Sequence, residues 1–141
     1  MSAEDLLGTQ GSRKGILLLL SGPAGSGKST LLRRALDEDR NLVFSISCTT
    51  RSPREGEVDG KDYHFLSDEE FSKRIENNEF LEHAEVHKWQ YGTQSNAVVD
   101  ILNDGKDVIM DIDVHGADQV RACKDPVISD ALVDIFITTS D

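Results

Sequence analysis

Apolar residues occur in short runs along this chain, and polar or glycine-bearing stretches separate the runs. Short apolar runs bounded by turn residues predict strands, and a run without polar alternation suits a strand buried on both faces. The predicted strands lie at residues 16–21, 41–47, 80–86, 108–113 and 132–137.

Three other segments have the spacing of helices. In the first, at 28–38, Leu32 and Leu36 lie one helical turn apart. The second opens at Ser67, which can cap it with Glu70 at the capping-box position, and ends near residues 77–78. The third runs over about 94–103 and stops before a glycine.

The outer parts of the chain alternate strand and helix, which predicts an α/β fold with a parallel sheet flanked by helices. The middle, 47–93, departs from that alternation and predicts an inserted lobe of short strands and a helix. Within it, Asp59-Gly60 is a tight-turn signal around which short strands are expected to pair, up to Phe65. Ligands of parallel sheets bind beyond the carboxyl ends of the strands, where Asp111 and Asp113 are expected to share one face.

A glycine-rich segment between the first strand and the first helix fits the phosphate-loop pattern G-x-x-x-x-G-K-[ST]. Backbone N–H groups and a helix N-terminus then point at one place, which suits a polyphosphate. Lys28 can reach the β- and γ-phosphates, and Ser29 can ligate Mg²⁺. The predicted ATP-binding residues are Gly22, Pro23, Ala24, Gly25, Ser26, Gly27, Lys28, Ser29 and Thr30.

Composition narrows the class of protein. A chain of 141 residues with 38% hydrophobic content predicts one globular domain after a disordered leader at 1–14. The net charge of −11 argues against a nucleic-acid surface, and no run approaches the roughly 18 apolar residues of a membrane span. The two separated cysteines and the lack of a secretory signal predict a cytoplasmic protein.

The middle of the chain resembles the guanylate kinases, P-loop kinases of nucleoside monophosphates. The resemblance rests on TTRSPREGE at 49–57, GKDYHF at 60–65, NEFLE at 78–82, YGT at 91–93 and DID at 111–113. The order and spacing agree over about 15–140. A core at 15–46 and 94–141 with a GMP-binding lobe at 47–93 is therefore expected.

The resemblance implies a role for each of these residues. Ser47 and Thr93 would donate to guanine, while Glu82 and Asp113 would accept from it. Arg51 and Arg54, with Tyr63 and Tyr91, would hold the GMP phosphate, because arginine forks suit phosphates. The expected catalytic residues are Lys28, Arg51 and Arg54, and the expected magnesium residues are Ser29 and Asp111.

The family therefore predicts transfer of the γ-phosphoryl group of ATP to GMP, with dGMP as a further candidate, in purine nucleotide metabolism. The family's lid arginines, return strand and final helix are not found in these 141 residues, so binding with slow turnover is expected of them. An alternative is a guanylate-kinase-like module that binds phosphopeptides through the same arginines. The intact phosphate loop and the short leader favour the kinase.

Overall fold

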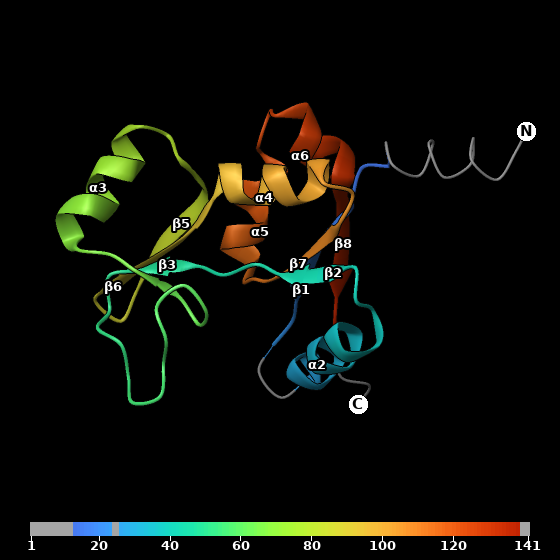
Figure 1. The fold of residues 1–141 in the computed structure, drawn as a ribbon, viewed down its shortest axis with the longest axis horizontal. Coiled ribbons are helices and arrows are strands. Elements are labelled where there is room, and N and C mark those ends of the chain that lie inside the picture. Colours follow the sequence, from blue (N-terminus) through green and yellow to red (C-terminus); the bar gives the residue numbers. More distant parts are fainter. Residues whose placement is uncertain (1–12, 24–25, 139–141) are drawn as a thin grey trace, which may run out of the picture.

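The computed structural model describes residues 13–23 and 26–138. Residues 1–12 of the predicted leader (1–14), the loop residues Ala24 and Gly25, and residues 139–141 lie outside this part of the chain. At the end of the predicted leader, Arg13 pairs with Asp107 of the core at 3.1 Å. Within it the chain forms two sheets that lie side by side (Figure 1).

The first sheet is parallel, as predicted, in the order β2-β7-β1-β8. Its strands are β1 (Leu17–Ser21), β2 (Leu42–Phe44), β7 (Asp107–Asp111) and β8 (Leu132–Phe136). Because side chains alternate between faces, the leucines of β1 pack on both sides of the sheet. Leu17 and Leu19 join one core cluster, and Leu20 joins the other.

Helices cover both faces of this sheet. Residues of α4 (Ser95–Asn103), α5 (Val114–Arg121) and α6 (Pro126–Ala131) pack into the larger cluster, and α2 (Lys28–Glu38) packs into the smaller one. Figure 1 shows α2 on the opposite side of the sheet from α4, α5 and α6. No helix in the described ranges is long and apolar enough to cross a membrane.

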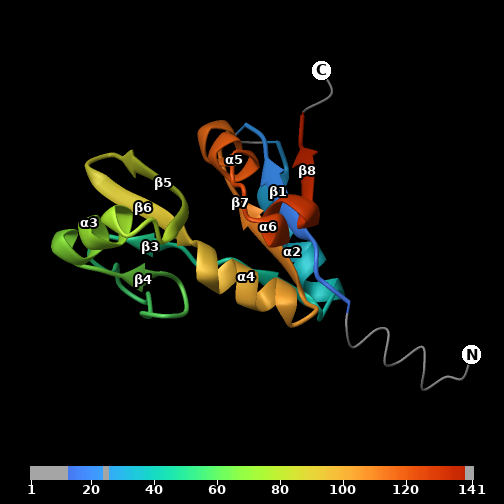
Figure 2. The same cartoon turned by 90° about the horizontal axis from the view of Figure 1, so that it is seen from above.

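The second sheet comes from the middle of the chain and has the order β4-β3-β6-β5. Its strands are β3 (Cys48–Thr49), β4 (His64–Phe65), β5 (Phe80–Val86) and β6 (Trp89–Gln94), and α3 (Asp68–Glu76) completes it. Seen from above, in Figure 2, this sheet and α3 lie apart from the core sheet and next to α4 and α5. The predicted cap of α3 is confirmed, because the Ser67 hydroxyl accepts a hydrogen bond from the Glu70 N–H.

Three expectations were wrong in detail. The predicted strand at 41–47 ends at Phe44, after which the chain crosses to the other sheet and forms β3. An isolated bridge joins Asp59 and Tyr63 across the glycine turn, but β4 then pairs in parallel with β3 and not around the turn. Asp113 is not on a strand with Asp111: β7 ends at Asp111, and Asp113 is the N-cap of α5.

Candidate nucleotide site

The phosphate loop joins the carboxyl end of β1 to the N-terminus of α2. Gly22 has a φ of 153°, and a Cβ there would lie 2.5 Å from the Ile137 carbonyl oxygen. Gly27 caps α2 in the left-handed region, with a φ of 87°. Both positions therefore need glycine. Ser26 Oγ is buried without a hydrogen-bond partner among the described residues, so this polar atom can accept or donate to a ligand in the loop.

The loop lysine faces a carboxylate from the adjacent strand. Lys28 Nζ lies 2.9 Å from Asp111 Oδ1, and Leu20 of β1 is in register with Asp111 of β7. Both side chains are partly exposed, at 22% and 33%. Parallel pairing of β1 with β7 thus places a cation and an anion together at the carboxyl edge of the sheet, as the sequence predicted for these two residues.

A cavity of about 240 Å³ continues from this edge toward the second sheet. Three predicted site residues line it: Ser47, Tyr63 and Asp111. Glu57 and Asp62 line it too, and sequence reasoning gave neither a role. Asp111, which also contacts Lys28, thus lines one cavity together with residues of the middle segment.

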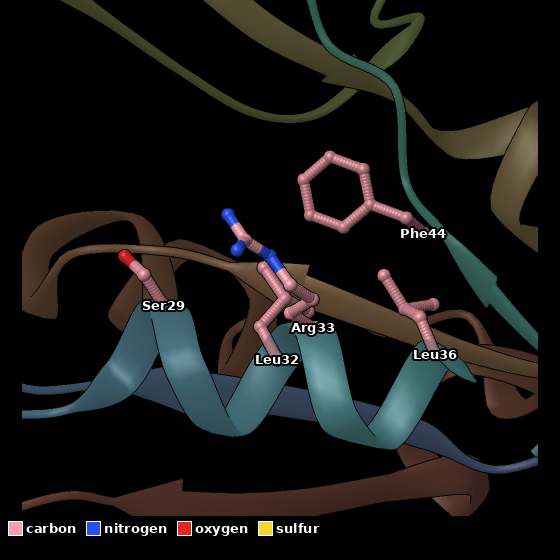
Figure 3. Close-up of a pocket in the computed structure, with 5 residues that line it drawn as sticks. All are labelled: Ser29, Leu32, Arg33, Leu36 and Phe44. Atoms are coloured by element: carbon pink, nitrogen blue, oxygen red, sulfur yellow. The ribbon is translucent and has the colours of Figure 1, made fainter. Parts of the chain in front are cut away.

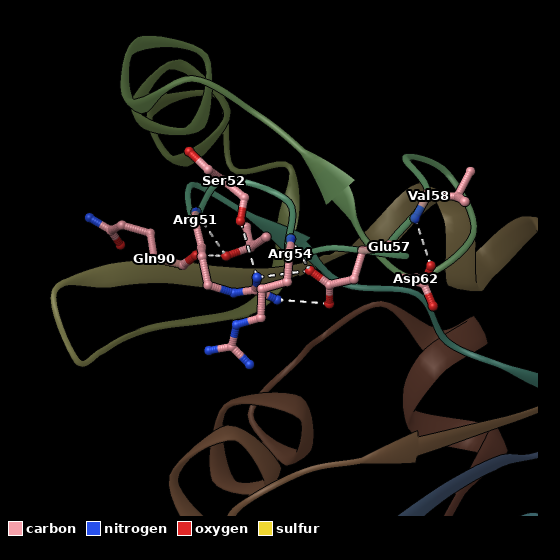
Figure 4. Close-up of polar contacts among 8 residues, drawn as sticks. Arg51, Ser52, Arg54, Glu57, Val58, Asp62 and Gln90 are labelled. Atoms are coloured by element: carbon pink, nitrogen blue, oxygen red, sulfur yellow. Dashed lines mark hydrogen bonds and ion pairs between the residues drawn. The ribbon is translucent and has the colours of Figure 1, made fainter.

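Arg51 is the most constrained cation of the site. Only 7% of its side chain is exposed, and its Nη1 and Nη2 donate to Glu57 Oε1 and Oε2 at 2.8 and 3.0 Å. Glu57 Oε1 also accepts from the Arg54 N–H at 2.7 Å (Figure 4). The Arg51 hydrogen bonds lower the pKa of Glu57 to about 2, and the same carboxylate raises the pKa of Arg51. The pair is fully ionised at neutral pH.

The predicted phosphate clamp assembles around this pair. The Arg51 guanidinium lies 5.2 Å from the centre of the Tyr63 ring, and the Tyr63 and Tyr91 rings meet edge-on at 6.1 Å. Arg51 Nε is buried and has no hydrogen-bond partner within the described residues. The Arg54 guanidinium points away from Glu57 in Figure 4. Arg51, Tyr63 and Tyr91 are therefore brought together, with Arg54 beside them.

Of the residues expected to recognise guanine, Glu82, Thr93 and Asp113 lie near one another, while Ser47 lines the cavity with Tyr63. Glu82 and Thr93 are cross-strand partners on β5 and β6, and Thr93 Oγ1 donates to Glu82 Oε1 at 2.8 Å. Burial raises the pKa of Glu82, the Thr93 hydrogen bond opposes that rise, and the charge of Asp113 adds to it. Asp113 Oδ1 accepts from the Gly116 N–H at 2.8 Å, which fixes this carboxylate at the start of α5.

A second hollow, an open groove of about 340 Å³, lies between α2 and β2. Its walls are Ser29, Leu32, Arg33, Leu36 and Phe44. In Figure 3, the side chains of α2 and of Phe44 face the same space. Ser29 therefore sits at the meeting point of the phosphate loop and an apolar groove, which the sequence did not indicate.

Comparison with known proteins gives a family for this arrangement. A family model described as "Guanylate kinase" matches residues 14–140. The chain belongs to the guanylate kinase family. It is 51% identical to a guanylate kinase of Maricaulis maris over 113 residues, covering 80% of this chain and 52% of the relative. For a Campylobacter jejuni guanylate kinase the identity is 49% over 129 residues, covering 91% and 61%.

A solved structure supports the same fold. The guanylate kinase of Anaplasma phagocytophilum superposes with a TM-score of 0.68 at 35% identity, covering 90% of this chain and 61% of that one. The chain spans about half the length of the curated guanylate kinases it matches.

Glu57 is one of the two cavity-lining acids that sequence reasoning left without a role. A weak signal was present: an acid lies three residues after Arg54, just past Gly56 in a polar turn. That spacing lets one carboxylate accept from both the Arg51 side chain and the Arg54 backbone. Charge spacing in a loop has no fixed geometry, however, so the bidentate pairing could be seen only in the folded chain.

Proposed function

We propose that this chain is the nucleotide-binding part of an ATP:GMP phosphotransferase. The observation that supports it best is one cavity whose lining contacts both of the expected anion-binding residues. Asp111 lines it and pairs with Lys28, and Tyr63 lines it with its ring 5.2 Å from the Arg51 guanidinium. A donor triphosphate on the loop and an acceptor monophosphate at the clamp would then face each other. Positioning of this kind, with neutralisation of charge, is most of what phosphoryl transfer requires.

In this proposal a phosphate oxygen of GMP attacks the γ-phosphorus of ATP. The new bond joins that oxygen to phosphorus, and the bond to the β-phosphate oxygen breaks, which gives GDP and ADP. No general base is needed, because the attacking oxygen is already anionic near neutral pH. Lys28, Arg51 and Arg54 would neutralise charge on the transferring and accepting groups.

Guanine would be recognised by Glu82 and Asp113 as acceptors for its N1–H and N2–H₂ groups, and by Ser47 and Thr93 as donors. In this structure the Thr93 hydroxyl donates its one proton to Glu82, which orients that carboxylate, so the hydroxyl would have to turn away from Glu82 to donate to guanine. Adenine offers no matching pair of donors, and the loss of a hydrogen bond to a charged group such as half-buried Glu82 costs about 1.5–3 kcal/mol. The expected preference is therefore for GMP, with dGMP accepted because no contact to the ribose 2′-hydroxyl is proposed.

Ser29 and Asp111 would hold Mg²⁺ against the β- and γ-phosphates of ATP. Their hydroxyl and carboxylate oxygens are ligands of the kind this ion prefers, and it commonly keeps few protein ligands beside substrate phosphates. When bound, the ion neutralises charge on those phosphates. Lys28 Nζ and Asp111 Oδ1 lie 2.9 Å apart, so this ion pair would hold both side chains at the ATP phosphates.

For the 141 residues by themselves we expect nucleotide binding and slow transfer. Their relatives are about twice as long, and a further arginine at the transferring group is worth about 10³–10⁵ in rate. A turnover number near 10 s⁻¹, ordinary for enzymes, would contradict this expectation.

Calorimetry tests the proposed function directly. The 141-residue chain is titrated with GMP, dGMP, AMP, UMP and a phosphoserine peptide under one buffer condition. Binding of GMP and dGMP, with AMP and UMP at least about tenfold weaker, supports the kinase. Binding of the peptide and not of GMP would favour a phosphopeptide-binding module, whose arginine clamp would be the same.

A further inference from the structure

One side chain of the core helix α5 pairs with the edge of the second sheet as a neighbouring strand would. Gln119 Oε1 accepts from the His83 N–H at 3.0 Å, and Gln119 Nε2 donates to the His83 carbonyl at 3.0 Å. Both groups are partly buried. β5 is at the edge of its sheet, so these outward backbone groups have no strand beside them.

The two elements that this link joins also carry the two carboxylates proposed to recognise guanine. His83 directly follows Glu82 on β5, and α5, which holds Gln119, begins directly after Asp113. Glu82 thus comes from a strand of the second sheet and Asp113 from the N-cap of a core helix, and Asp113 is near enough to raise the pKa of Glu82. Like charges favour separation, so some other contact must hold β5 against α5.

We infer that Gln119 is a positioning residue for base recognition: its amide fixes the backbone beside Glu82 at a set distance from Asp113, so that both carboxylates face one purine edge. The inference rests on the proposed function and names a determinant of its specificity. Within 13–23 and 26–138 the amide hydrogen-bonds to His83 alone, so we expect its loss to act on the base and not on the phosphate loop.

The test compares two substitutions on the same helix. Gln119→Met keeps length and volume and removes both hydrogen bonds. Arg121→Gln is the matched control, because the Arg121 guanidinium binds Asp118 at 2.7 Å and Asp134 at 2.8–2.9 Å, away from β5. The 141-residue chain and both variants are titrated calorimetrically with GMP, AMP and ATP, and exchange of the His83 amide proton is followed by NMR.

Gln119→Met is expected to weaken GMP binding about 3- to 30-fold. The substitution removes two neutral hydrogen bonds, and only part of their stabilising contribution is expected to affect GMP binding. Binding of AMP and ATP stays within twofold of the unaltered chain, so discrimination between GMP and AMP falls by the same factor. The His83 amide exchanges faster. Arg121→Gln leaves all three affinities and the His83 exchange rate unchanged.

Equal GMP affinity in Gln119→Met and the unaltered chain overturns the inference. So does an equal loss for GMP, AMP and ATP, which would mark a general loss of structure. If the unaltered chain does not bind GMP, the proposed function fails, and this inference fails with it. Should Gln119→Met not fold, Gln119→Glu keeps the acceptor for the His83 N–H and loses the donor, and the same comparison with Arg121→Gln decides.

Discussion

Replacing Glu82 with glutamine is expected to stabilise the empty protein and to weaken GMP binding. The carboxylate is half-buried, and burial raises its pKa above the ordinary value of 4.5. The charged form is therefore unfavourable in the folded chain at neutral pH. Glutamine has the same shape, and its carbonyl oxygen can still accept from Thr93 Oγ1, now 2.8 Å from Glu82 Oε1.

The pH dependence of folding stability gives the direction of the change expected for Glu82→Gln. A carboxyl group whose pKa is raised by folding contributes its full stability below its unfolded pKa and loses it as pH rises through the folded pKa. The melting temperature of Glu82→Gln should therefore exceed that of the unaltered chain at pH 7. The difference should vanish as the pH falls below 4.5, the ordinary value at which Glu82 becomes neutral in both states.

The binding cost comes from the base contact. The amide of glutamine would present a donor where guanine also presents donors, so at least one hydrogen bond to a charged group is lost. That bond is worth about 1.5–3 kcal/mol, or about 10- to 150-fold in Kd. Thermal melts at pH 7 and pH 4, with calorimetric GMP titrations at pH 7, measure both effects. A lower melting temperature at pH 7, or an unchanged Kd for GMP, would refute the reasoning.

Three further substitutions have defined outcomes. Lys28→Met should abolish detectable phosphoryl transfer from ATP to GMP, while the Kd for GMP stays within about twofold of that of the unaltered chain. Phosphoryl transfer retained in a coupled assay would show that Lys28 does not have the role proposed for it. Gly22→Ala should abolish ATP binding measured by calorimetry, because its Cβ would lie 2.5 Å from the Ile137 oxygen; ATP binding within tenfold of the unaltered chain would contradict this. Phe71→Ala should cost about 3–5 kcal/mol in urea unfolding, since Phe71 is 1% exposed and packs 4.5 Å from the Phe80 ring; a loss under about 1 kcal/mol would show that the site collapses.

The strands and helices that the sequence predicted well are those whose hydrophobic pattern is unambiguous. The strand at 80–86 has the predicted bounds, and the helix at 28–38 begins directly after the phosphate-loop turn. Local sequence is sufficient there, because an apolar run predicts the strand and the left-handed Gly27 turn sets where the helix begins. The core sheet followed, since alternating strands and helices admit few arrangements.

The middle segment was harder to predict because tertiary pairing decides it. Asp59-Gly60 has the local signature of a hairpin turn, and Gly60 does adopt a positive φ of 82°. Yet the residues after the turn pair in parallel with Cys48–Thr49, more than ten positions earlier in the chain. A two-residue strand has too little pattern to specify its partner, so only the packing of the folded chain settles the pairing.

The error at Asp113 has a consequence for the site. On a continued strand, Asp111 and Asp113 would both face the phosphate loop, and two carboxylates there would repel a polyphosphate. The strand instead ends at Asp111, whose carboxylate lies beside Lys28, and Ile112, 7% exposed, packs into the core. Asp113 then turns to cap α5, where its charge acts on Glu82. A change from strand to helix across one buried residue thus divides two neighbouring acids between the proposed phosphate site at Lys28 and the proposed base site at Glu82.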